Sequence, residues 1–247
     1  MLFREENGEI LAVAQTAHAW IAGQILRAWR EPLPEPVLFA ADVHDIGWLD
    51  WEASPSFNPA TGRPHSFREI GPVLHSPMWR AGVGKALAGW GRHVALLVSR
   101  HGGLIWVRMK PSGADRDAVQ AYLREQGTRE AEWARELGID DTEARRQSGL
   151  IAFADALSLA LCSNLKPPLD LEAPGADGKP ETLHLTAKSG EPYAFAMSPW
   201  PFREPRLEVW GEGWKLPASG RFASEAEFRD YFPHAPRARF RAVLTGE

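Results

Sequence analysis

The sequence predicts a mainly α-helical protein, a helical bundle followed by a small C-terminal antiparallel β-sheet. Apolar residues recur at helical spacing over the first two thirds of the chain, whereas near the C-terminus they alternate with polar residues. Between these regions, residues 170–180 are rich in Pro, Gly and Asp and predict a linker or surface loop. We therefore expect a helical domain over residues 1–166 and a small β-rich subdomain over residues 167–247 packed on it.

The first helices follow from apolar stripes and prolines. Residues 12–29 place apolar side chains on one stripe at three-and-four spacing, which predicts a helix. A second helix is expected to open with Pro34 and Pro36 and to end at Gly47. Residues 52–75 contain four prolines and two glycines, so they predict a long irregular loop.

The remaining elements are predicted from helix caps, from glycines and from the alternation of apolar and polar residues. Ser76 and Pro77 predict a helix start, and Gly89 and Gly91 are expected to break that helix. Further helices are expected over residues 93–100, 114–126, 129–137 and 141–162, the first three closed by glycines. Strands are expected at residues 182–186, 207–210 and 240–244, with a short helix over residues 224–231.

Composition is that of an ordinary globular protein. The 247 residues are 44% hydrophobic and 24% charged, which excludes a disordered or collagen-like chain. The net charge of −4 comes from scattered charges of both signs, so binding of nucleic acid driven by charge is not expected. The most apolar run, residues 150–162, is too short to span a membrane, and the acidic N-terminal segment does not resemble a signal peptide. With Cys162 as its single cysteine, the protein is expected in the cytoplasm.

Two polar side chains stand where the helical pattern places apolar residues. His18 lies within the stripe of residues 12–29, and Asp155 lies between Ile151 and Leu159, one turn away on either side. Burial of an ionised carboxylate alone costs several kcal/mol, so such a group is usually paired, fully hydrogen-bonded or bound to a metal. Because no Lys or Arg lies within one turn of Asp155, its partner must come from elsewhere in the fold.

His44 and Asp45 provide such a partner set. Adjacent helical residues point about 100° apart, so both side chains can reach one ion at the flank of a helix. Two imidazoles and two carboxylates suit Fe, Mn, Ni, Co, Zn or Mg. Two further histidines lie between these residues in the sequence and could complete a second site. We therefore expect one or two divalent ions held by His18, His44, Asp45, His75, His101 and Asp155.

Several of these residues also have a simpler interpretation. His18 could be a satisfied core histidine, His101 could cap the C-terminus of its helix, and His75 could merely precede a helix. Four residues are candidates for substrate binding, with core packing or a solvated surface as the alternative: Trp48, Arg63, His65 and Arg100.

The order of these ligands resembles the HD-domain superfamily of metal-dependent phosphohydrolases. The segment His44–Gly47 is similar to its signature, and the two intervening histidines are similar to those of its two-metal members, which include cyclic-dinucleotide phosphodiesterases. Those phosphodiesterases carry a lysine where Trp48 stands, which disfavours that substrate. Other segments resemble a bacterial family of unknown function: Trp51, Thr61–Pro64, Ser99–Gly102, Asp155–Leu159 and Pro199–Phe202.

The resemblance implies a phosphomonoesterase or phosphodiesterase that acts on a small phosphorylated or nucleotide substrate. A divalent ion lowers the pKa of bound water towards 7, and Asp45 is then the expected catalytic residue, bridging two ions. The same ligand order occurs in a di-iron oxygenase branch of the superfamily, which is one alternative. Another is a non-catalytic binding protein with a structural metal site. The C-terminal sheet could close the pocket or pair with a second subunit in a homodimer.

Overall fold

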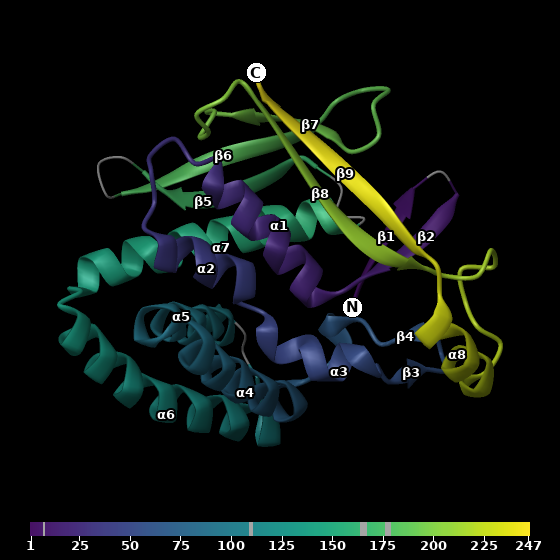
Figure 1. The fold of residues 1–247 in the computed structure, drawn as a ribbon, viewed down its shortest axis with the longest axis horizontal. Coiled ribbons are helices and arrows are strands. Elements are labelled where there is room, and N and C mark those ends of the chain that lie inside the picture. The colour runs from purple at the N-terminus through teal and green to yellow at the C-terminus, as the bar shows by residue number, and fades with distance from the viewer. Residues whose placement is uncertain (7, 109–110, 164–166, 176–178) are drawn as a thin grey trace.

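The computed structural model describes residues 1–247 except residues 7, 109–110, 164–166 and 176–178. A curved sheet lies along one side of the helices (Figure 1). The helices are α1 (Gln15–Arg27), α2 (Glu35–Val43), α3 (Leu49–Ala53), α4 (Pro72–Trp90), α5 (Arg92–Arg108), α6 (Gly113–Leu137), α7 (Asp141–Cys162) and α8 (Glu225–Tyr231), with short 3₁₀ segments η1 (Ile46–Trp48), η2 (Phe67–Glu69) and η3 (Phe232–His234). Within the described residues, no helix is both long and apolar enough to cross a membrane.

Most strands of the described chain join one seven-stranded sheet in the order β1-β2-β8-β9-β7-β6-β5. Neighbours are antiparallel except β7 and β9, which are parallel. A separate small pair is formed by β3 and β4. The bounds are β1 (Leu2–Glu6), β2 (Glu9–Val13), β3 (Phe57–Asn58), β4 (Arg63–Pro64), β5 (Leu169–Pro174), β6 (Pro180–Ala187), β7 (Ala194–Ser198), β8 (Arg206–Lys215) and β9 (Arg237–Gly246).

The expected fold class, a mainly α-helical bundle followed by a small C-terminal antiparallel sheet, is therefore wrong. The sheet is large and mixed, and it includes the N-terminal hairpin β1–β2. The apolar run of β2 continues into the apolar stripe of α1, so the two elements look like one helix in the sequence. The expected domain boundary falls beside residues 164–166, which lie outside the described residues, and that division stays a prediction.

The buried Arg4 joins the N-terminal hairpin to the rest of the molecule. Its guanidinium donates hydrogen bonds to the carbonyl oxygens of Leu161 in α7, at 2.5 Å, and of Arg241 in β9, at 2.8 Å. The same group lies 3.2 Å from the ring centroid of Tyr193. Hydrogen bonds of this charge-assisted kind each contribute about 1.5–3 kcal/mol, so Arg4 holds three distant parts of the chain together.

Close packing of helices on the sheet positions the elements that carry the site. Helix α1 packs on β8 at Gly211, where a Cβ atom would lie 2.9 Å from Cδ1 of Ile21. Trp29, just after α1, contacts Phe153 of α7 with ring centroids 5.4 Å apart. These contacts set α1 and α7 side by side beneath the sheet, as Figure 1 shows.

Several predicted boundaries differ from those observed. Helix α4 begins at Pro72, which takes the first-turn position expected for Pro77, and η2, β3 and β4 interrupt the expected loop. Helix α5 continues through Gly102, and α6 is one helix that contains Gly127. A glycine costs a helix only about 1 kcal/mol, which tertiary packing outweighs. The expected linker begins with strand β5, whereas the predicted helix over residues 141–162 is confirmed as α7.

Candidate metal centre

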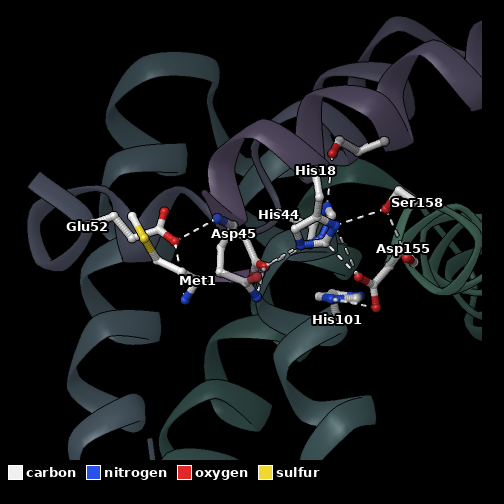
Figure 2. Close-up of polar contacts among 10 residues, drawn as sticks. Met1, His18, His44, Asp45, Glu52, His101, Asp155 and Ser158 are labelled. Atoms are coloured by element: carbon white, nitrogen blue, oxygen red, sulfur yellow. Dashed lines mark hydrogen bonds and ion pairs between the residues drawn. The ribbon is translucent and has the colours of Figure 1, made fainter. Parts of the chain in front are cut away.

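The structure brings five of the six predicted ligands into one cluster (Figure 2). The Nε2 atom of His18 lies 2.9 Å from Oδ2 of Asp45, and that of His44 lies 3.4 Å from Oδ1 of Asp155. The Nε2 atom of His101 lies 3.8 Å from Oδ2 of Asp155. Two atoms bound to one ion at about 2.1 Å can be no more than about 4.2 Å apart. Each of these separations therefore suits a shared ion.

Four helices supply these residues, and the end of α2 supplies two of them. Asp45 leaves the helical conformation directly after His44, with φ −105° and ψ 20°. The following turn lies tightly against α4 because Gly47 has no side chain: a Cβ atom there would lie 2.2 Å from the carbonyl oxygen of Met78. The His-Asp-Ile-Gly sequence thus both ends the helix and allows the close approach of η1 to α4.

Hydrogen bonds to the Nδ1 atoms orient two of the imidazoles. Ser158 Oγ donates to the carbonyl oxygen of Asp155, so it accepts a hydrogen bond from Nδ1–H of His18 at 2.9 Å. Nδ1–H of His44 donates to the carbonyl oxygen of Ala41, also at 2.9 Å. With the proton on Nδ1, the Nε2 lone pair of each ring faces the carboxylates, which is the usual arrangement for a histidine that binds a metal.

The cluster favours a positive charge between its carboxylates. Burial lowers the pKa of His44, but Asp45 and Asp155 outweigh it and raise that pKa to about 9. Burial raises the pKa of Asp45, but His44 and His18 hold it well below its usual range. The carboxyl pKa of Asp155 is lowered too, because the neighbouring imidazoles, His44 at 3.4 Å above all, overcome its burial. Either a proton or a metal ion would satisfy this preference.

His101 supplies the strongest sign that a metal fits. Both of its ring nitrogens are buried without a hydrogen-bond partner among the described residues, as is Nε2 of His44. Burial lowers the pKa of His101 to about 4, so its ring is neutral at physiological pH. Buried polar atoms rarely stay unpaired in native proteins. A divalent ion of the borderline or hard class would pair Nε2 of His44 and one nitrogen of His101 with the two carboxylates.

Gln15 is hydrogen-bonded to Asp45 of the cluster. Its amide Nε2 donates to Oδ2 of Asp45 at 3.2 Å, and its backbone N–H donates to Oε1 of the buried Glu52 at 2.7 Å. Burial raises the pKa of Glu52 to about 7. Gln15 therefore links Asp45 to a second buried carboxyl group that lies outside the ligand cluster.

His75, the sixth predicted ligand, lies in a different environment. It belongs to neither of the two ligand groups found among the described residues. Its ring centroid is 4.3 Å from that of Trp48, 4.4 Å from Trp79 and 5.2 Å from Trp106. Burial lowers the pKa of His75 to about 4. Its role as a ligand stays a prediction, but it lines the same pocket as Asp45.

This pocket, of about 300 Å³, extends outward from the ligand cluster. Two of the candidate ligands, Asp45 and Asp155, line it, and the rest of its wall is largely aromatic and aliphatic. Its lining residues are Gln15, Asp45, Trp48, Phe67, Arg68, Ile70, His75, Trp79, Ile105, Trp106, Asp155 and Leu159. A small molecule in the pocket would therefore contact the carboxylates directly.

Of the predicted substrate-binding residues, the structure brings only Trp48 to the pocket lining described above. Arg63 donates from Nε to the carbonyl oxygen of Gly220 at 2.7 Å. His65 is hydrogen-bonded to Ser56, and Arg100 donates to Oγ of Ser148 at 3.2 Å. These three side chains hold neighbouring segments together.

Sequence reasoning missed other residues of the site. Trp79 lies four residues after His75, and Ser158 lies three residues after Asp155, so helical spacing places each on the face of a predicted ligand. That spacing could have identified both. Arg68 carried no comparable signal, because it lies in a segment without a regular period.

Comparison with known families identifies the chain without supplying an activity. The model of a family described as "Protein of unknown function (DUF3891)" matches residues 1–218, and the chain belongs to this family. The matched range includes every helix that carries a candidate ligand and ends between β8 and α8. No curated protein and no solved structure matches the chain.

Proposed function

We propose that the protein is a metal-dependent phosphohydrolase, related to the HD-domain superfamily, that cleaves a small phosphorylated substrate in this pocket. The observation that carries the proposal is the convergence of Nε2 lone pairs and carboxylates at the inner end of a pocket. This donor set suits Fe, Mn, Ni, Co or Zn, and also Mg where carboxylates dominate. One or two such ions, when bound, would lower the pKa of a coordinated water towards 7 and offset negative charge on phosphate.

The residues of the chain then have distinct tasks. His18, His44, His101 and Asp155 would hold the cation, and the carboxylate of Asp155 would also offset its charge. Asp45 remains ionised at neutral pH because the imidazoles keep its pKa low, and it lines the pocket. It is therefore placed to accept a hydrogen bond from the attacking water and to orient it.

No side-chain nucleophile is needed in this scheme. The described lining of the pocket contains no Ser, Thr or Cys. The single cysteine, Cys162, is buried, and burial raises its thiol pKa to about 12. Direct attack by water is therefore the reaction that the pocket favours.

The test combines elemental analysis with a phosphatase panel. The panel contains p-nitrophenyl phosphate, bis(p-nitrophenyl) phosphate, glycerol phosphate and adenosine monophosphate. We expect the purified protein to contain a divalent metal and to hydrolyse at least one ester, with release of phosphate from a monoester or of p-nitrophenol from the diester. We expect Asp45→Ala to reduce turnover by about 10³-fold or more, about 4 kcal/mol of transition-state stabilisation.

The matched control is Asp170→Ala. Asp170 is also hydrogen-bonded to a histidine, His184, at 2.7 Å, but this pair is exposed on strands β5 and β6. The control should keep its metal and its turnover. Full activity of Asp45→Ala, or the absence of a divalent metal from the purified wild type, would overturn the proposal.

A di-iron oxygenase is the second candidate, favoured by the apolar character of the pocket. Arg68 is the only Lys or Arg among the described lining residues, and three tryptophans form much of the wall. The two activities separate under anaerobic conditions. Phosphate release without oxygen supports the hydrolase, whereas oxygen uptake by the iron-loaded protein with no phosphate release on the panel supports the oxygenase.

A further inference from the structure

Three tryptophans that line the pocket share an unusual feature. The indole Nε1 atoms of Trp48, Trp79 and Trp106 are all buried without a hydrogen-bond partner among the described residues. An indole N–H can only donate. A buried donor that stays unpaired costs about 1–3 kcal/mol, so three in one place require an explanation.

The rings that carry these donors gather around one residue. The rings of all three tryptophans lie around His75, whose Nε2 atom also lacks a partner within the described chain. The ring centroids of Trp79 and Trp106 are 4.8 Å apart. No other buried indole nitrogen of the described residues is unpaired, and Trp200, for example, donates to the carbonyl oxygen of Glu204 at 2.7 Å.

A single cation accompanies these donors. Arg68 lines the pocket, and no ion pair joins its guanidinium to an acidic side chain among the described residues. It lies 5.5 Å from the ring centroid of Phe67. The lining thus offers several donors for a group that accepts hydrogen bonds, and that group is expected to be negatively charged.

The rest of the wall suits an apolar group. Phe67, Ile70, Ile105 and Leu159 supply aromatic and aliphatic surface. Outside the ligand cluster, Gln15 is the only amide side chain of the described lining, so the hydroxyl groups of a sugar would find few partners. The volume of about 300 Å³ is at the small end of the usual range for ligand pockets.

We propose that the substrate is a compact phosphate monoester of an aromatic or other apolar alcohol. Its phosphate oxygens accept hydrogen bonds from the indole N–H groups of Trp48, Trp79 and Trp106 and from Arg68, while its organic group lies against the apolar wall. This assignment rests on the proposed function, which places the phosphate beside Asp45. Hydrolysis forms a bond from the water oxygen to phosphorus and breaks the bond from phosphorus to the alcohol oxygen, which receives the proton lost by the water.

Binding can be measured apart from turnover with phenylphosphonate, which has a P–C bond that is not hydrolysed. Calorimetry on the metal-loaded protein compares it with inorganic phosphate, benzyl alcohol and uridine monophosphate. We expect phenylphosphonate to bind at least tenfold more tightly than each of the other three. Equal or tighter binding of uridine monophosphate would overturn the substrate class.

Variants test the donors themselves. Trp106→Phe and Arg68→Gln should each weaken phenylphosphonate binding about tenfold, with metal content unchanged. Trp90→Phe is the matched control, because Trp90 is 41% exposed and is not among the lining residues. Replacement of Trp106 by 3-benzothienylalanine keeps the shape of the ring and removes only the N–H. Wild-type affinity in that protein would overturn the role of the indole donor, even if the phenylalanine variant fails to fold.

The two proposals fail in different ways. Tight binding of phenylphosphonate without hydrolysis of phenyl phosphate would overturn the phosphohydrolase and support the ligand class. Hydrolysis of glycerol phosphate or a nucleotide that phenylphosphonate does not inhibit would support the phosphohydrolase and overturn the ligand class.

Discussion

The two sides of the pocket differ in the interaction partner that they lack. At the inner end, the ligand cluster has two carboxylates and imidazole lone pairs, with no Lys or Arg paired to Asp45 or Asp155 within the described residues. The tryptophan wall, formed by Trp48, Trp79 and Trp106, has donors and no acceptor for them. One side therefore requires a cation and the other requires an acceptor. An anion bound to a metal ion satisfies both at once, which is why unpaired buried atoms are informative about missing ligands.

Removal of a shared ligand should have the largest effect. His44 belongs to both ligand groups. Residues that only contact a metal ligand change metal affinity by up to about 100-fold when they are replaced. His44→Ala should therefore weaken metal binding by more than about 100-fold. Turnover should fall with it. Metal titration and kcat check this. His93→Ala, which removes a hydrogen bond to Gln147 instead, should change neither, and a metal affinity of His44→Ala equal to that of the wild type would contradict the role of the cluster.

Removal of the metal should be the next largest effect. An ion present at 100 times its Kd stabilises the folded state by about 2.7 kcal/mol, which for a chain of this size is about 5–10 °C in melting temperature. Differential scanning fluorimetry before and after chelation measures this shift. An unchanged melting temperature would argue against a bound ion. A large shift in a protein that hydrolyses nothing would instead indicate a structural metal site.

Gly102 connects the two sides, and its substitution should have a smaller effect. It follows His101 of the ligand cluster, and a Cβ atom there would lie 2.6 Å from Cε3 of Trp79 and 2.7 Å from the hydroxyl of Tyr122. Gly102→Ala should cost about 1–3 kcal/mol of unfolding free energy and weaken phenylphosphonate binding more than metal binding. Urea denaturation and calorimetry test both effects.

The control is another helical glycine. A Cβ atom at Gly127 in α6 would meet nothing within 4 Å, so Gly127→Ala should stabilise the protein by up to about 1 kcal/mol. If the two substitutions changed the free energy of unfolding equally, the close packing of Gly102 against Trp79 would not be the reason that position 102 requires glycine.

The smallest effect is expected in the chemical labelling of Cys162, the last residue of α7, which is the helix that carries Asp155. Its side chain is buried, and burial raises its pKa to about 12, so iodoacetamide at pH 8 should label it negligibly in the native protein. Mass spectrometry measures the label. The same protection in His44→Ala would show that loss of the ligand leaves α7 folded, and rapid labelling of the wild type would contradict its burial.

The ligand cluster could be predicted because its residues break a pattern. His18 and Asp155 interrupt apolar stripes in the sequence. The tertiary structure then brings Nδ1 of His18 to 3.8 Å from Oδ1 of Asp155. The tryptophan wall could not be predicted in the same way, because tryptophans fit any apolar face and these come from three separate segments. Arg63 is a candidate for substrate binding because of its charge and its place in the expected loop, and neither feature indicates the carbonyl group to which its side chain donates.

The sheet was harder to predict than the helices for a related reason. The strand β1 contains Arg4, which is fully buried and reads as a surface residue in the sequence. Its burial depends on carbonyl groups of Leu161 and Arg241, more than 150 residues away. Local sequence patterns indicate which side chains are buried because they are apolar. Arg4 is polar, and it is buried only once distant segments supply its hydrogen-bond acceptors.

The N-terminal hairpin also constrains the order of events during synthesis. Leu11 in β2 pairs with Lys215 in β8, so the edge of β2 opposite β1 has no strand beside it until residue 215 has left the ribosome. Helices that carry the ligand cluster emerge much earlier and can pack first. A nascent chain must keep that exposed strand edge from pairing with other chains until β8 arrives to cover it.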